Sequence, residues 1–361
     1  MINNNFKYTI LGFLMTVLCL NFMSCNRKDS NASVKKAPQQ IPQSDIAEGE
    51  ALSGKSTGLE ENLKIRLLSN RLIADSLNSD LYFTRGNAYL EEGRPEFAVA
   101  DFIKAIKLDS TQSSYYLAAA EIYFKSQQLP PAIRIMERAI RNIPQESQQL
   151  HLELGKYYFY VGKNKESSKE LNKVLAKDAN VAEAYFWKGM IARDKEDVKD
   201  AITNIKKSLQ LESGAYNPNM ILGQILASQG NAECLKYYDQ AAKIDPLSIE
   251  SLYAKALFLQ ENKREDEALK EYTRIISISP QYQDAHYNTG YIYFKKGEYE
   301  RAKKSFHGAV RVSPAFAKAY YMRGYCDEKL GDKEAAKGDY ERAVNFDPEL
   351  SLAQEGLDRV K

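Results

Sequence analysis

The chain has 361 residues, which is long enough to bury a sizeable core and on length alone favours about two domains. Hydrophobic residues make up 44% of it, and 50 Lys and Arg against 48 Asp and Glu leave a net charge of +2. These values argue against wholesale disorder and against a nucleic-acid partner. Three histidines and four cysteines leave little material for a metal site or a disulfide framework.

The first 24 residues have the pattern of an export signal. Lys7 precedes an apolar run over residues 8–22, and a small residue followed by cysteine comes soon after it, at Ser24-Cys25. About 20 apolar residues are needed to span a bilayer, and this run is shorter and contains polar residues. A permanent transmembrane helix is therefore the weaker interpretation.

The segment that ends at Cys25 resembles the lipobox of bacterial lipoproteins, in which the cysteine thiol is acylated and becomes the new N-terminus. The resemblance implies a signal peptide over residues 1–24, a palmitate-type acyl group on Cys25 and attachment to a membrane. By resemblance to the sorting of other lipoproteins, Asn26 indicates the outer membrane of a bacterial cell envelope. An ordinary cleaved signal and an uncleaved anchor are the alternatives.

Residues 25–58 are expected to form the lipid anchor and a disordered tether. They are rich in Ser, Gln, Pro, Lys and Gly and hold almost no clustered apolar residues, so they cannot bury enough surface to order themselves. Thr57-Gly58-Leu59-Glu60 then has the spacing of a capping box, which predicts a helix within residues 59–78. We expect this helix to cap the repeats that follow, because the end of a repeat array needs one polar outer face. Its apolar positions are Leu59, Leu63, Leu67, Leu68 and Leu72.

A pattern with a period near 34 residues runs from residue 79 to residue 350. One slot holds a small residue in every unit, and a second small slot and a bulky slot follow about 12 and 16 residues later. The first slot holds Gly86, Ala120, Gly155, Gly189, Gly223, Ala256, Gly290 and Gly324. The bulky slot holds Phe102, Met136, Leu171, Ile205, Tyr238, Tyr272, Phe306 and Tyr340.

Each unit is expected to be a helix–turn–helix. Apolar residues within each half-unit recur at helical spacing, and turn residues such as Glu92-Gly93 separate the halves. Two antiparallel helices approach closely only where their crossing point lacks bulk. We therefore expect the small slot of the first helix to face the small slot of the second, with the bulky residue filling the remaining space.

This arrangement resembles the tetratricopeptide repeat family, most closely from Tyr287 to Pro314, where the small, aromatic and proline slots agree in phase. The resemblance implies an all-α fold, an α-solenoid of about eight helix-turn-helix units over residues 79–350 with terminal capping helices. Leu352, Leu357 and Val360 predict the C-terminal cap over residues 351–361. One elongated domain with a tether thus replaces the two domains that length alone favours.

No pattern in the sequence favours catalysis or a cofactor. A phosphate-binding glycine loop, a nucleophile elbow and an HExxH pattern are all missing, and the acidic residues are scattered along helix faces. His151, His286 and His307 lack companion ligands at metal spacing. Cys234 and Cys326 fall in slots for small buried residues nearly three units apart. We expect no enzyme activity, no cofactor, no metal and no disulfide between these two cysteines.

The family resemblance implies that the first helices line a concave partner-binding surface. Units seven and eight stand out, because Tyr287, Tyr291, Phe294, Tyr321 and Tyr325 would project together there. Such amphipathic rings suit an extended peptide or a sugar ring. For the large residues three positions before each small slot, packing between neighbouring first helices is an equally open alternative. The other expected groove residues are Phe83, Asn87, Phe186 and Tyr253.

Together these features predict a lipid-anchored adaptor or scaffold without catalysis of its own. By resemblance to tetratricopeptide lipoproteins of bacteria, it is expected to bind other envelope proteins or extended peptides in assembly, secretion or cell-wall machinery. The alternative is a glycan-binding surface lipoprotein with an aromatic groove, but the regular period leaves no room for inserted sugar-binding loops. A repeat fold does not determine its partner, so the partner's identity is not predicted.

Overall fold

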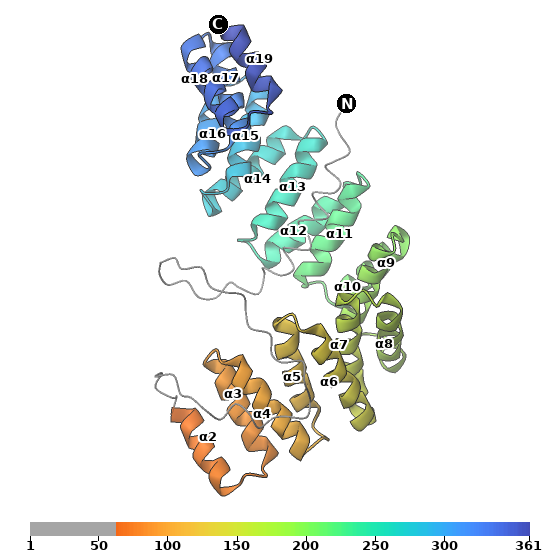
Figure 1. The fold of residues 1–361 in the computed structure, drawn as a ribbon. Helices are drawn as coiled ribbons and strands as arrows, with labels where there is room; N and C mark the ends of the chain where they lie inside the picture. Colours follow the sequence, from red (N-terminus) through yellow and green to blue (C-terminus); the bar gives the residue numbers. More distant parts are fainter. Residues whose placement is uncertain (1–62) are drawn as a thin grey trace. The chain divides into compact units, whose positions relative to one another are not determined.

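The computed structural model describes residues 63–361, apart from the side chains of residues 146 and 147 (Figure 1). The predicted export signal, Cys25, the predicted tether and residues 59–62 of the predicted N-terminal helix lie outside the described residues. Eight consecutive helix pairs are flanked by one further helix at each end, and the described range contains no strand. The predicted all-α solenoid is confirmed.

The helices follow one another with short turns between them. The N-terminal half contains α2 (Leu63–Ala74), α3 (Ser79–Glu91), α4 (Pro95–Leu108), α5 (Ser113–Lys125), α6 (Leu129–Asn142), the 3-10 turn η1 (Pro144–Glu146), α7 (Ser147–Tyr160), α8 (Asn164–Lys177), α9 (Ala182–Asp194) and α10 (Val198–Leu211). The C-terminal half contains α11 (Tyr216–Ser228), α12 (Cys234–Ile244), α13 (Ile249–Glu261), α14 (Glu265–Ile278), α15 (Gln283–Lys295), α16 (Tyr299–Val312), α17 (Ala317–Leu330), α18 (Lys333–Phe346) and α19 (Ser351–Val360).

Contacts between helices follow chain order, as in a repeat array. Each first helix packs on the second helix of its own unit and on the second helix of the unit before it. Some first helices also contact the next first helix, including α5 with α7, α7 with α9 and α15 with α17. In these units the first helices form a continuous row, which is what a shared surface on first helices requires.

The turn inside each pair repeats one backbone conformation. At this position five pairs have a glycine with positive φ, such as Gly297 at 76°. The other three pairs hold Gln127, Glu196 and Lys263 in the same left-handed region, at φ of 60° to 61°. A side chain in that region costs about 1 kcal/mol or more, so these three turns are strained and the glycine turns are not.

In most units whose small slot is glycine, this slot faces the bulky residue of the second helix more closely than it faces the second small slot. A Cβ placed on Gly290 would lie 2.9 Å from the Phe306 ring, and one on Gly86 would lie 2.4 Å from the Phe102 ring. In three units the carbonyl oxygen of the second small slot also lies near, as Ala336 does at 3.0 Å from a Cβ on Gly324. The glycine therefore leaves space for the ring of the second helix. This refines the expectation that the two small slots face each other.

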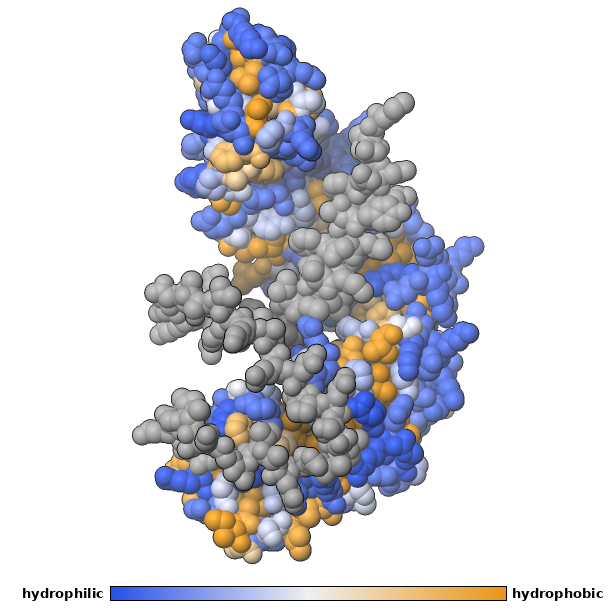
Figure 2. Space-filling view, viewed as in Figure 1, coloured by the Kyte–Doolittle hydropathy of each residue, from blue (hydrophilic) through white to orange (hydrophobic). Residues whose placement is uncertain are grey.

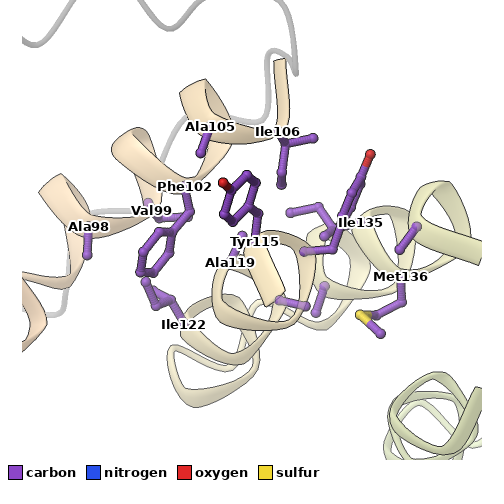
Figure 3. Packing of buried hydrophobic residues seen from close by; sticks show 14 of the residues in the cluster. Ala98, Val99, Phe102, Ala105, Ile106, Tyr115, Ala119, Ile122, Ile135 and Met136 are labelled. Atoms are coloured by element: carbon purple, nitrogen blue, oxygen red, sulfur yellow. The ribbon is translucent and has the colours of Figure 1, made fainter. Parts of the chain in front are cut away.

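Buried residues of neighbouring units pack together in shared core clusters, one of which runs from Ile65 to Tyr157. Figure 3 shows Phe102 of α4 beside Tyr115 and Ile122 of α5. Phe102 and the second small slot at Ala98 have no exposed surface, and Tyr115 is 2% exposed. Since burying a large side chain contributes about 1.5–3 kcal/mol, contacts between units stabilise the array in addition to those within them.

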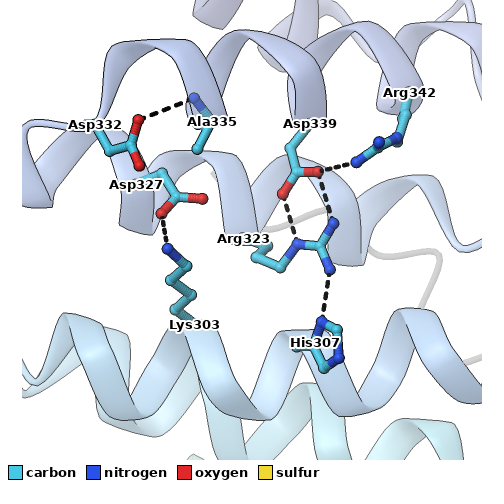
Figure 4. A network of polar contacts seen from close by, with 8 residues as sticks. All are labelled: Lys303, His307, Arg323, Asp327, Asp332, Ala335, Asp339 and Arg342. Atoms are coloured by element: carbon cyan, nitrogen blue, oxygen red, sulfur yellow. Dashed lines mark hydrogen bonds and ion pairs between the residues drawn. The ribbon is translucent and has the colours of Figure 1, made fainter.

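A polar contact also repeats between units. The residue just before the small slot is Arg85, Lys255 or Arg323 in three of the first helices, and each reaches an acid 16 residues later in its own unit. Arg323 donates to both carboxylate oxygens of Asp339, at 2.5 and 2.7 Å (Figure 4). Each cation also contacts a residue 16 positions earlier, and for Arg323 this is His307 at 3.0 Å. Such bridges tie a first helix to the second helices on both sides.

The sequence predicts structural roles for the histidines and for the two cysteines of the repeat region. Cys234 and Cys326 are buried in α12 and α17, and burial raises the pKa of the Cys234 thiol to about 11 and that of Cys326 to about 12. His151 of α7 is buried against α8, where its Nδ1 lies 2.5 Å from Glu170 Oε2. His286 Nε2 lies 3.1 Å from the carbonyl oxygen of Pro280. All four side chains take part in helix packing.

The two ends of the array are different. At the C-terminal end α19 packs on α17 and α18, and its Gly356 lies against the Tyr340 ring. At the N-terminal end only one face of α2 is covered: Leu68 and Leu72 are buried, whereas Leu63 is 60% exposed and Leu67 is 54% exposed. The outer face of α2 therefore mixes exposed leucines with polar side chains such as Arg66 and Asn70.

Candidate functional site

The predicted aromatic residues of units seven and eight lie on α15 and α17, two first helices in contact. Tyr287, Tyr291 and Phe294 follow helical spacing, which places them on one side of α15. The ring centroid of Phe294 lies 5.1 Å from that of Tyr325, and Tyr325 stacks on Tyr321 at 6.0 Å. We call these five residues the C-terminal aromatic face.

Part of this face belongs to the core. Tyr287 lies against the rings of Phe306 and Phe316, at 5.5 and 5.2 Å, and burial raises the pKa of its hydroxyl to about 12. Tyr321 lies 5.8 Å from the buried ring of Tyr340, and burial raises its pKa as well. For the slot three residues before the small residue, these two units therefore favour packing between helices.

The rest of the face is accessible. Tyr291 is 38% exposed, and no other ring of the described residues packs against it. Tyr325 is half-buried, with Lys329 Nζ 5.1 Å and Arg359 Cζ 5.5 Å from its ring centroid. The Arg359 guanidinium also binds Glu328, whose pKa it lowers. An accessible phenol thus lies beside rings that the core holds in place, with cations at the border.

The other predicted groove residues are not gathered at this face. Phe83 on α3 packs against Phe102 and Tyr115, at 5.3 and 4.9 Å, and Asn87 on the same helix is half-buried. Phe186 on α9 lies 5.1 Å from Trp187. These residues take part in packing within and between their own units.

Tyr253 on α13 is the one further predicted residue that adjoins α15. Its ring packs against Tyr282 at 5.4 Å, and its hydroxyl accepts a hydrogen bond from Asn288 Nδ2 at 3.2 Å. Burial raises the pKa of Tyr253 to about 12. Tyr253 therefore continues the C-terminal aromatic face toward α13 but is itself part of the packing.

A second group of rings lies on α5, α7 and α9 and was not predicted. Phe124 packs against Tyr157 and Tyr160, at 4.9 and 5.0 Å, and Trp187 packs against Phe159 and Tyr160, at 5.3 and 5.5 Å. We call these five residues the central aromatic cluster. The run Tyr157-Tyr158-Phe159-Tyr160 and the single tryptophan of the chain were the signals in the sequence that could have revealed it.

Carboxylates border the central aromatic cluster and form a hydrogen bond and an ion pair there. Trp187 Nε1 donates to Glu183 Oε1 at 3.0 Å, and Glu153 pairs with Lys156 at 3.3 Å. Burial raises the pKa of Glu153, and the neighbouring carboxylates Glu183 and Glu121 add to the effect. Most of these rings cover one another, so the cluster stabilises the stack of α5, α7 and α9, although Tyr160 at its edge is 37% exposed.

A polar cavity of about 610 Å³ lies between α16, α17 and α18 (Figure 4). Its charged groups neutralise one another: Lys303 pairs with Asp327 at 2.5 Å, and both Arg323 and Arg342 pair with Asp339. Within residues 63–361, no group of three or more potential ligand side chains is placed to hold a metal ion. Over the same residues, no helix combines the length and apolar character needed to cross a membrane.

Two tetratricopeptide repeat family models match the chain, one over residues 152–218 and 284–350 and the other over residues 79–112 and 249–282. These segments fall on the helix pairs described above. No curated protein matches the chain.

Solved structures with the same fold include the C-terminal part of a TPR repeat-containing protein from Cytophaga hutchinsonii, with 16% identity and a TM-score of 0.58 over 66% of this chain and 98% of that one. A tetratricopeptide repeat protein from Parabacteroides merdae also matches, with 16% identity and a TM-score of 0.44 over 68% of this chain and 98% of that one. The matched family models and the stacked helix pairs agree. The chain belongs to the tetratricopeptide repeat family.

Proposed function

We propose that this chain is an adaptor that binds partner proteins or extended peptides through the C-terminal aromatic face. Stacked helix pairs of this family present long continuous surfaces, which suits them to protein interaction. The observation that carries the proposal is the accessible ring of Tyr291, one helical turn after Tyr287, whose own ring packs against the buried ring of Phe306. Rigid aromatic residues lose little conformational entropy on binding and often dominate interface energies.

The proposed partner site is tested by crosslinking in cells. A photoreactive benzoylphenylalanine at position 291 is expected to capture partner proteins, and Tyr325→Ala in the same chain is expected to reduce the yield. Loss of one aromatic anchor of about 2 kcal/mol corresponds to roughly thirtyfold in affinity. Phe346 on α18 is the control position, because it is 48% exposed but lies on a second helix. Equal capture from both positions would count against the proposed site.

We further propose that the adaptor is attached to the outer membrane of a bacterial envelope by an acyl group on Cys25. The apolar run over residues 8–22 and the Ser24-Cys25 pair that follows support this. Cys25→Ala is expected to abolish fatty-acid labelling and to release the chain from the membrane or block its maturation. Labelling that persists in this variant would contradict the proposal.

A further inference from the structure

The first described helix, α2, has the position of a second helix in a repeat unit. Arg85 of α3 donates to Ser69 of α2, 16 residues earlier, at 3.1 Å. Lys255 of α13 reaches Asp239 of α12 across the same spacing, at 2.7 Å. The helix α2 therefore stacks on α3 as α12 stacks on α13. Among the described residues no first helix precedes α2, so none of those residues covers the face on which such a helix would pack.

The open side of α2 carries a stripe of three apolar residues and one asparagine. Leu63, Leu67, Asn70 and Ala74 are spaced by four, three and four residues, which aligns them along one line of the helix. All four are exposed and lie opposite the buried residues of the helix. Ile73 is 83% exposed beside them. In Figure 2 hydrophobic surface is visible at the lower end of the view, where α2 and its turn to α3 lie.

Cations flank this stripe on both sides. Residues 63–74 contain Lys64, Arg66 and Arg71 and no acidic residue. At 100° per residue, Arg66 and Arg71 fall on opposite sides of the line through Leu63 and Leu67. Lys64 is held by Glu91 at 2.7 Å, so the charges that face outward are the two arginines. An apolar stripe between two arginines is the pattern of a helix that lies in a membrane interface, where long basic side chains reach anionic headgroups.

Another occupant fits this face less well. A second copy of the chain in a symmetric contact would bring Arg66 and Arg71 against the same residues of its partner, and like charges oppose such pairing. A first helix from this chain's own N-terminal segment is a further occupant. Small slots lie 33 to 35 residues apart, which would place Ala51, Leu52 or Ser53 in that slot, so deletion of residues 45–57 tests this occupant directly.

We propose that the outer face of α2 binds the surface of an anionic lipid membrane, with Leu63 and Leu67 in the interface and Arg66 and Arg71 at the phosphate level. Asp75, the acidic residue that follows the helix, accepts a hydrogen bond from Asn78 Nδ2 at 2.9 Å. The contact is shallow and orients the first repeat unit. It involves neither the C-terminal aromatic face nor acylation of Cys25.

The test measures hydrogen exchange of the full chain bound to vesicles of phosphatidylcholine alone or with one third phosphatidylglycerol. Amides of residues 63–77 are expected to exchange at least tenfold more slowly on the anionic vesicles, since each arginine near such a surface adds about 1 kcal/mol, or roughly fivefold. The acyl group proposed at Cys25 would attach the chain to both kinds of vesicle, so that the difference reports on α2; a chain without this group is mixed with the same vesicles and compared in the same way.

Two variants and a matched control make the test specific. Both Leu63→Gln/Leu67→Gln and Arg66→Gln/Arg71→Gln are expected to abolish the difference between vesicles. Leu247→Gln/Leu352→Gln removes two leucines that are 70% and 47% exposed elsewhere and is expected to keep it. The arginine variant leaves the apolar contacts of α2 intact. It therefore still tests the proposal if the leucine variant fails to fold.

Three results would overturn the proposal. Equal protection on both kinds of vesicle would exclude an electrostatic membrane contact. Protection that appears without vesicles and rises with protein concentration would assign the face to a second copy of the chain. Protection without vesicles that disappears on deletion of residues 45–57 would assign it to the chain's own N-terminal segment.

Discussion

The central aromatic cluster and the C-terminal aromatic face use the same residue types on the same kind of helix but place the rings differently. Trp187 of the central cluster is 5% exposed and touches two rings of α7. Tyr160 is 37% exposed but packs against Phe124 and Trp187, whereas Tyr291 is 38% exposed and no ring of the described residues covers it. The number of aromatic residues therefore does not distinguish a packing region from an accessible surface. The position of each ring in its repeat unit and the size of its neighbours decide the difference.

The largest expected effect concerns the central cluster. Trp187→Ala is expected to lower the free energy of unfolding by about 3–5 kcal/mol, because it leaves a cavity among the rings of three helices. Tyr291→Ala is expected to change it by less than about 0.5 kcal/mol, because the ring is accessible. Urea unfolding of both variants measures these values. Equal losses would mean that the two regions do not differ as described.

A smaller effect is expected from overfilling a helix crossing. Gly290→Leu is expected to lower the free energy of unfolding by about 1–3 kcal/mol, since the leucine side chain would clash with Phe306. Hydrogen exchange is expected to rise first in α13 to α18, and Gly189→Leu is expected to produce the same change around the central cluster. Gly338→Ala is the control, because nothing lies within 4 Å of a Cβ there. Uniform loosening of the whole chain would contradict a quasi-one-dimensional array.

Substitutions in the turns inside the helix pairs are expected to change the free energy of unfolding by about 1 kcal/mol. Glu196, between α9 and α10, has φ 61°, and Gly297, between α15 and α16, has φ 76°. Glu196→Gly is expected to stabilise the central region by about 0.5–1 kcal/mol, and Gly297→Ala is expected to destabilise the C-terminal region by a similar amount. Thermal unfolding measures both shifts, which should have opposite signs. Shifts of the same sign would mean that the left-handed turn is not under strain.

The smallest expected effect is a pH dependence specific to unit three. The pKa of His151 is lowered, with burial as the largest cause; Lys173 and Lys177 lower it further, and Glu170 offsets only part of these effects. The folded state therefore binds this proton less readily than the unfolded state, and the contribution of His151 to stability falls as the pH drops below roughly 6.5. In urea unfolding between pH 7 and pH 5, His151→Gln is expected to lose less stability than the parent chain. An equal loss in both would contradict this assignment.

The period near 34 residues determined much of the fold, and the structure confirms it. Small slots, bulky slots and turn residues recur in phase, and each is a local requirement of two helices that cross closely. Buried positions such as Phe306, Cys234 and Cys326 followed from this register. The lipid attachment at Cys25 lies outside the described residues and stays a prediction from its sequence pattern.

Only the tertiary structure decided which residues of one slot are accessible. Met190 and Tyr291 both come just after the small residue of their units, yet Met190 is 2% exposed and Tyr291 is 38% exposed. Likewise Leu67 and Leu68 are adjacent on α2, and only Leu68 is buried, because no described helix covers the opposite face. A repeat pattern specifies contacts within a unit and with the next unit. Exposure also depends on the size of side chains from neighbouring helices and on where the array ends, and neither is encoded in the period.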